Sequence, residues 1–414
     1  MNEPGQETPF LLALFIGHRG DRSATAGITD AQWMELLDLA RRHQVSVLLH
    51  RRLQQRNWYS RVPDTARAML LAAARRGAAR SLLLHAGLRH INHALTAAAV
   101  PFLVLKGAHL AHAIYESPEL REMIDLDILV PRDAVRRAVD ALESAGYRAS
   151  TPYVLDSQVD QHHHLTPLIR NSVAVEVHWE LFPARGSSRV GTGSLFDTAT
   201  TVTVDGERLR GLSLEDLLVH LCVHAARHHV FALGIRALVD IDQLLARHAE
   251  IDWSRVRGRA RERSAWREVA LTVLLAHDLL GTPLPASLMQ SIQGDCDSRI
   301  RRLAMRRILA PPPAVSEAVA RFAVAPLRWS TVRAMLAQLF SRGQIARTYG
   351  LPVNSPRVLL HYPAWMLDIL RRHGAKVLTW TLGDSDAKRS AREQLALMEW
   401  LEGTGPAPIS KGTG

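Results

Sequence analysis

The sequence VLKGAHLAHAIYESPELREMIDLDILV, residues 104–130, decides how this chain folds. The apolar run at residues 102–105 is short enough for a buried strand, and Lys106-Gly107 interrupt it. Residues 108–115 then predict a short helix that ends before a Ser-Pro pair typical of turns. Because free N–H groups and the helix dipole favour anions at a helix start, Lys106 and Gly107 are candidate anion-binding residues.

A second strand is predicted at residues 124–130, where apolar and acidic residues alternate. Side chains two apart on a strand share a face, so Asp125 and Asp127 point together and their apolar neighbours pack the other way. Those neighbours are Ile124, Leu126 and Ile128. Adjacent carboxylates repel each other unless a cation lies between them, and Mg²⁺ prefers carboxylate and phosphate oxygens. The pattern alone also fits the solvent-exposed face of an edge strand.

A third alternating segment, VAVEVHW at residues 173–179, predicts another strand. Its apolar face carries Val173, Val175, Val177 and Trp179. Glu176 and His178 lie on the opposite face, where Glu176 is either a further metal ligand or one polar residue of a half-exposed sheet.

The order Leu-Lys-Gly, helix, LREMIDLDILV resembles the uncharacterised nucleotidyltransferase family of the polymerase-β-like superfamily. The resemblance continues through HHHL, VEVHWEL, LLVHLCVHAARHH and LVDIDQLL, and it covers residues 30–290 in rough outline. The sequence departs from the family pattern at Glu116, where a proline commonly follows the tyrosine. Its turn also has one glycine after lysine, where better-known polymerase-like enzymes have a Gly-Ser pair.

The resemblance implies an α+β fold, with a small mixed β-sheet of the polymerase-β nucleotidyltransferase type flanked by N- and C-terminal helical regions. It implies Mg²⁺-dependent transfer of a nucleoside monophosphate from an NTP such as ATP to an unknown acceptor, which is a protein, a peptide, a small molecule or RNA. Asp125, Asp127 and Glu176 are the expected metal-binding and catalytic residues. Lys106, the Gly107 amide and Arg121 are the expected triphosphate-binding residues.

Three alternative functions remain open at this point. The same cleft in a catalytically silent module would bind a nucleotide or peptide, although retention of both aspartates favours an enzyme. A sugar-nucleotide glycosyltransferase using Asp-x-Asp is disfavoured, because no doubly wound nucleotide-binding half precedes the motif. His220, His224 and His228 are spaced four apart on a predicted helix at residues 213–229, with Asp240 and Asp242 downstream. They allow a metal-dependent His/Asp hydrolase, but no HExxH glutamate is present, and helix packing explains such a stripe equally well.

The composition is that of an ordinary globular protein, with 414 residues, 47% hydrophobic and 22% charged. No apolar run approaches the ~20 residues of a membrane span, and the two cysteines give no disulfide framework. The apolar stretch at residues 10–16 lacks a small-residue cleavage site, so we expect a cytoplasmic protein. The net charge of +11 comes almost entirely from arginine, and together with many alanines it indicates a GC-rich bacterial genome. Nucleic acid is therefore not the favoured partner.

The helix-start and turn residues along the chain predict six regions. Thr29-Asp30-Ala31-Gln32 is a capping box that starts a helix, and a longer helix follows Pro63 with Met69, Leu82 and Leu83 among its expected core residues. The regions are a loose lead-in (1–28), an N-terminal helical region (29–99), the nucleotidyltransferase core (100–212), a helical domain (213–310), a C-terminal helical region (311–401) and a flexible tail (402–414).

Overall fold

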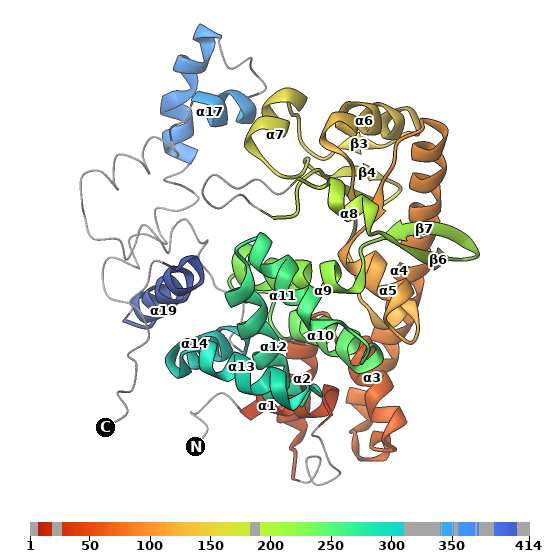
Figure 1. The fold of residues 1–414 in the computed structure, drawn as a ribbon, viewed down its shortest axis with the longest axis vertical. Helices are drawn as coiled ribbons and strands as arrows, with labels where there is room; N and C mark the ends of the chain where they lie inside the picture. Colours follow the sequence, from red (N-terminus) through yellow and green to blue (C-terminus); the bar gives the residue numbers. More distant parts are fainter. Residues whose placement is uncertain are drawn as a thin grey trace. The chain divides into compact units, whose positions relative to one another are not determined.

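The computed structural model describes residues 7–18, 27–182, 191–309, 340, 342–349, 351, 355–368, 371 and 385–403. The chain forms two compact units. The first contains Met1–Ser150 and Val159–Pro312, and the second contains Thr151–Gln158 and Pro313–Gly414. The first unit holds one mixed β-sheet among many helices, which confirms the α+β class (Figure 1).

The sheet has seven strands in the order β3-β4-β5-β2-β1-β7-β6. Their bounds are β1 Leu103–Val104, β2 Asp125–Leu129, β3 Arg148–Ala149, β4 Leu168–Arg170, β5 Val173–His178, β6 Thr200–Val204 and β7 Glu207–Gly211. Strand β2 lies in the middle, antiparallel to β1 and parallel to β5. The β6–β7 hairpin forms one edge of the sheet, next to β1.

Helices account for most of the first unit. The helices before the sheet are α1 Glu7–Ile16, α2 Asp30–Arg42, α3 Ser46–Gln55 and α4 Asp64–Ala97. The helices between its strands are α5 Lys106–Ala113, α6 Val135–Ser144 and α8 Gly193–Asp197. The helices after the sheet are α9 Leu214–Val223, the π-helix η5 His224–His228, α10 Ile235–Arg247, α11 Trp253–Glu262, α12 Trp266–Leu280, α13 Ala286–Asp295 and α14 Ser298–Leu309. Helix α7, Leu155–Gln161, contains a boundary between the two units.

Of two predictions about the N-terminal region, the loose lead-in was partly wrong and the capping box is confirmed. The expected loose lead-in contains helix α1, whose Leu12, Phe15 and Ile16 are buried. Phe15 stacks on Trp33 of α2, so tertiary packing stabilises a segment too short to be a stable helix alone. The Thr29 capping box is present as predicted.

The long helix α4 (orange in Figure 1) packs against strands β2 and β5 on their apolar face. A Cβ atom at Gly87 would lie 2.7 Å from Cγ1 of Val173, so this glycine permits the close approach of helix to strand. The buried stripe of α4 includes Leu70 and Leu88. The expected core residues Met69, Leu82 and Leu83 are instead exposed, because they lie outside the buried stripe of this helix.

The alternation in β2 and β5 is confirmed, except at one end. Leu126 and Ile128 are buried, as is the whole predicted apolar face of β5. Ile124 is 61% exposed, contrary to the prediction, because β2 begins only at Asp125. The two strands pair with Asp127 opposite Glu176, which places their acidic residues on one face of the sheet.

The second unit has its own small core. Helix α17, Arg342–Thr348, and the 3₁₀-helix η6, Pro356–His361, bury Ile345, Ala346, Val358 and Trp365. Helix α19 spans Ser385–Glu402. Much of the predicted C-terminal helical region (311–401) lies outside the described residues, as does most of the predicted tail.

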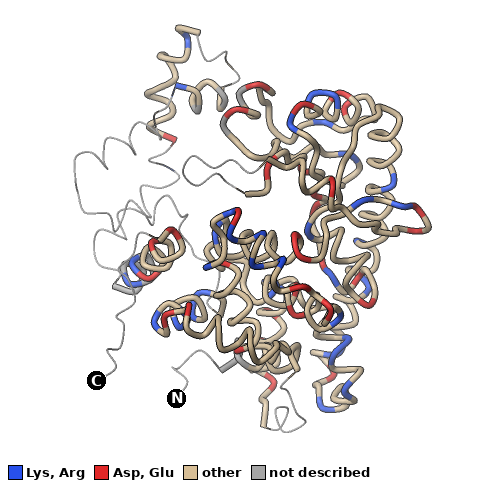
Figure 2. Tube along the Cα trace, viewed as in Figure 1, with Lys and Arg blue, Asp and Glu red and all other residues tan. Residues whose placement is uncertain are grey.

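Arginines of the first unit have acidic partners inside the fold. Figure 2 shows basic and acidic residues close together along many of the helices. Arg263 of the α11 region pairs with Asp216 at 3.2 Å, and Arg301 of α14 pairs with Asp278. Among the described residues, no helix is long and apolar enough to cross a membrane.

Candidate active site

A cavity of about 420 Å³ lies over the acidic face of the sheet, and we call it the site cavity. The residues that line it come from the Lys106 turn, the segment from Arg121 to Asp127, strand β5 and its preceding histidines, and the helices α9, η5 and α10. The structure brings all six predicted site residues to this cavity. They are Lys106, Gly107, Arg121, Asp125, Asp127 and Glu176.

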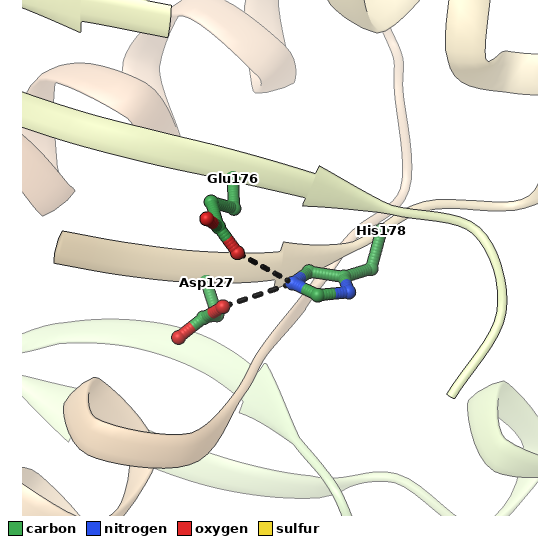
Figure 3. A group of neighbouring side chains, drawn as sticks. All are labelled: Asp127, Glu176 and His178. Atoms are coloured by element: carbon green, nitrogen blue, oxygen red, sulfur yellow. Dashed lines mark hydrogen bonds and ion pairs between the residues drawn. The ribbon is translucent and has the colours of Figure 1, made fainter. Parts of the chain in front are cut away.

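Asp127, Glu176 and His178 converge at the centre of the cavity wall (Figure 3). Nε2 of His178 lies 2.9 Å from Oδ1 of Asp127 and 3.5 Å from Oε2 of Glu176. One potential ligand atom from each residue lies within 4.8 Å of the other two. The parallel register of β2 and β5 produces this cluster, because it places Asp127 opposite Glu176 with His178 two residues further along the same face.

Lys106 contributes a positive charge to the same cluster. Its Nζ donates a hydrogen bond to Oδ1 of Asp127 at 2.7 Å. Lys106 has φ of 41°, in the left-handed region that non-glycine residues seldom adopt, at the first residue of helix α5. Such strain at a functional group is typical of binding sites.

The pKa values of the carboxylates around this cavity shift in opposite directions. Burial, together with the negative charges of Asp127 and Glu176, raises the pKa of Asp125 to about 6. Burial would also raise the pKa of Asp127, but the charge of Lys106 and the hydrogen bond from His178 hold it well below its usual range. Burial would also raise the pKa of Glu176, but the hydrogen bond with His178 lowers it below its usual value. The cluster therefore gathers negative charge that a divalent cation would neutralise.

These donors fit a divalent cation. Asp127 and Glu176 supply two carboxylates with His178 beside them, and Asp125 lines the same cavity two residues along β2. Mg²⁺ takes carboxylate oxygens and keeps several water ligands, so one or two carboxylates are enough to hold it.

Arg121 has a different environment from the one the sequence predicts for a phosphate ligand. Its Nε and Nη2 donate to Oδ1 and Oδ2 of Asp240 at 2.6 and 2.8 Å, and Tyr115 donates to the same carboxylate at 2.7 Å. Nη1 donates to the carbonyl oxygen of Glu122. The buried ion pair connects the segment before β2 to helix α10, while the triphosphate contact of Arg121 stays a prediction.

Sequence reasoning missed Arg236, which lines the site cavity from helix α10. Its Nη1 donates to Gln44, and no ion pair between Arg236 and a carboxylate is found among the described residues. Burial, and then the charge of Arg121, lowers the pKa of Arg236 to about 10. Its spacing four residues before Asp240 on one helix is a sequence signal that could have placed it beside the Arg121 pair.

Comparison with known proteins agrees with this geometry. Neither the curated proteins nor the solved structures include a significant match to the chain. A family model described as uncharacterised nucleotidyltransferase matches residues 29–281, more than half of the chain. The matched segment contains the whole acidic cluster and the helices that cover it. The chain therefore belongs to the uncharacterised nucleotidyltransferase family.

Proposed function

We propose that this protein is a Mg²⁺-dependent nucleotidyltransferase with a sheet of the polymerase-β type. It transfers a nucleoside monophosphate from an NTP to an acceptor hydroxyl or phosphate. The observation that carries the proposal is the parallel register of β2 and β5, which sets Asp127 opposite Glu176 with Asp125 on the same face. Membership of the family supports the reaction class.

In this proposal Asp125 and Asp127 would hold the metal, and Glu176 would complete the site beside them. Bound Mg²⁺ supplies positive charge at the triphosphate and at the acceptor oxygen. The acceptor oxygen forms a bond to the α-phosphorus, the bond to the bridging oxygen breaks, and pyrophosphate leaves. Glu176 accepts the acceptor proton, and His178 holds the carboxylates of Asp127 and Glu176 in place through its Nε2 contacts.

The phosphates bind at the start of helix α5. Lys106 provides a charge, and the N–H of Gly107 is one of the free donors of the first helical turn. A Cβ atom at Gly107 would lie 2.8 Å from both Cγ and Sδ of Met123, so a larger residue there displaces a side chain of the cavity wall. Arg236, which has no carboxylate partner among the described residues, supplies a second positive charge at the cavity.

The proposal is tested by incubating the purified protein with each of the four NTPs, Mg²⁺ and a cell extract, followed by mass spectrometry. The expected result is an acceptor whose mass increases by one nucleoside monophosphate, with pyrophosphate released in equal amount. Asp127→Asn should abolish transfer, and Asp133→Asn is the control because it removes an exposed aspartate next to the same sheet.

Two outcomes contradict the proposal. If Asp127→Asn and Asp125→Asn both transfer nucleotide at the undiminished rate, these two aspartates do not bind the metal. Binding of NTP by calorimetry without transfer to any component of the extract favours the catalytically silent module.

A further inference from the structure

One wall of the site cavity is built of histidines that the transfer reaction does not use. Four of these histidines are His220 of helix α9, His224 and His228 of the π-helix η5, and His229, the residue directly after η5. Nε2 of His224 lies 3.2 Å from Nε2 of His229. Nε2 of His228 and both ring nitrogens of His220 have no hydrogen-bond partner within the part of the chain that the structure describes.

The π-helix brings His224 and His229 together. Five residues along an α-helix turn the side chain by roughly 140° from its starting direction, so residues five apart point away from each other. A π-helix closes its hydrogen bonds over five residues, which brings such residues to nearly the same face. The sequence spacing of four predicts a stripe of His220, His224 and His228, whose neighbouring ring centroids lie 6.0 and 5.8 Å apart, and the structure also places His229 beside His224.

The backbone directly after this pair of histidines is strained. Directly after His229, Val230 has φ of 45° and Phe231 has φ of 61°, both in the left-handed region. A β-branched residue there is a true outlier, and both side chains are fully buried. The N–H of Phe231 donates to the carbonyl oxygen of Ala225, which closes the turn. Rare π-turns and strained residues both gather at functional sites.

The chemistry of two such nitrogens suits a borderline metal ion. Burial, and then the charge of Lys106, lowers the pKa of His224 well below its usual value, and the same two causes lower the pKa of His229 to about 4 although part of its surface stays exposed. Both rings are therefore neutral near pH 7, the state in which imidazole ligates metals. With Zn–N bonds of about 2.0–2.1 Å and tetrahedral angles, two ligand nitrogens lie roughly 3.3 Å apart. An N–H···N hydrogen bond between the rings is the alternative explanation of the 3.2 Å separation.

We propose that His224 and His229 bind a transition-metal ion of the Zn²⁺ class through their Nε2 atoms, beside the acidic centre. His229 is exposed, which gives an ion access to the pair. The remaining positions of the ion face the site cavity and accept water or a substrate atom. Asp127, Glu176 and His178 form a separate group and do not take part.

The test uses the full-length chain carrying Asp127→Asn, which weakens the acidic centre, with Zn²⁺ alone as the probe. Calorimetry at pH 7.5 should show one equivalent of Zn²⁺ bound, and X-ray absorption at the zinc edge should show at least two imidazole nitrogens. His224→Gln and His229→Gln should each weaken Zn²⁺ binding at least tenfold in this background. His93→Gln is the control, since His93 is an exposed histidine on α4 outside the cavity.

Circular dichroism and thermal melting check the fold of each variant, and the exposed position of His229 makes its substitution the decisive one. The proposal is overturned if the Asp127→Asn chain binds no Zn²⁺. It is equally overturned if His229→Gln binds Zn²⁺ as tightly as its parent, or if the absorption spectrum shows only oxygen ligands. None of these results bears on the transfer of nucleotide by the wild-type acidic centre.

Discussion

Asp125→Asn should stabilise the protein in the absence of divalent cations, although it removes a proposed metal ligand. The pKa of Asp125 rises from an ordinary 3.8 to about 6, because the carboxylate is largely buried beside Asp127 and Glu176. A shift of this size corresponds to about 3 kcal/mol of unfavourable free energy for the ionised form. Solvent in the cavity screens part of this interaction, so we expect a gain of about 1–3 kcal/mol.

The sign of the effect depends on pH. Above about pH 6 the carboxylate of Asp125 is ionised in both the folded and the unfolded chain, and the folded chain bears the full repulsion. As the pH falls through the unfolded pKa of 3.8, the group becomes protonated in both states and the difference disappears. The stabilisation by Asp125→Asn should therefore be full at pH 8, partial at pH 5 and absent at pH 3.5.

Urea unfolding in EDTA at these three pH values measures the difference, with Asp133→Asn as the matched control for loss of one exposed aspartate. Added Mg²⁺ should narrow the gap at pH 8, because it binds the ionised wild-type cluster and stabilises the folded state by mass action. A variant that is less stable than wild type at pH 8, or that gains the same stability at pH 3.5, would refute the reasoning.

Three further substitutions separate binding, transfer and folding. Lys106→Ala should weaken NTP binding by roughly 10–100-fold, the scale of one charged hydrogen bond. Unchanged affinity in calorimetry would show that Lys106 does not contact the phosphates. Glu176→Gln should leave NTP binding near normal and slow transfer by roughly 10² in a pyrophosphate-release assay, whereas an equal loss of binding would make Glu176 a primary metal ligand. Arg121→Ala leaves Asp240 buried without its ion pair and should cost about 3–5 kcal/mol in urea unfolding; unchanged stability with weaker NTP binding would instead support a phosphate contact.

Local patterns in the sequence predicted the acidic face but not the way it is assembled. Alternation in β2 and β5 places Asp125, Asp127 and Glu176 correctly on polar faces, since the side-chain period of a strand is a local property. The parallel pairing of the two strands is a tertiary fact that no spacing encodes. The resemblance to the family implied only that Glu176 belongs to the site, and the parallel pairing that sets it opposite Asp127 comes from the structure.

Other features were beyond sequence reasoning for the same physical reason. Helix α1 depends on the contact between Phe15 and Trp33, and the Arg121–Asp240 pair depends on helix α10 lying beside the segment before β2. The π-turn at His224 also has no local signature, because a regular helix has the lower intrinsic energy and only packing in the cavity wall favours the wider turn.

The pairing of β2 with β5 also determines when the acidic cluster can form as the chain folds. Asp127 and His178 are 51 positions apart, and helix α6 and the β3–β4 pair form from the residues between them. Closing so long a loop is entropically costly before the strand contacts compensate for it, and non-local parallel pairing is slow. A metal ion thus has no preformed ligand set in early folding species, and the cluster forms only after residues beyond His178 have been synthesised. In the proposed site, metal binding would therefore report the pairing of β2 with β5, and an isolated peptide spanning the Asp-x-Asp strand should not reproduce it.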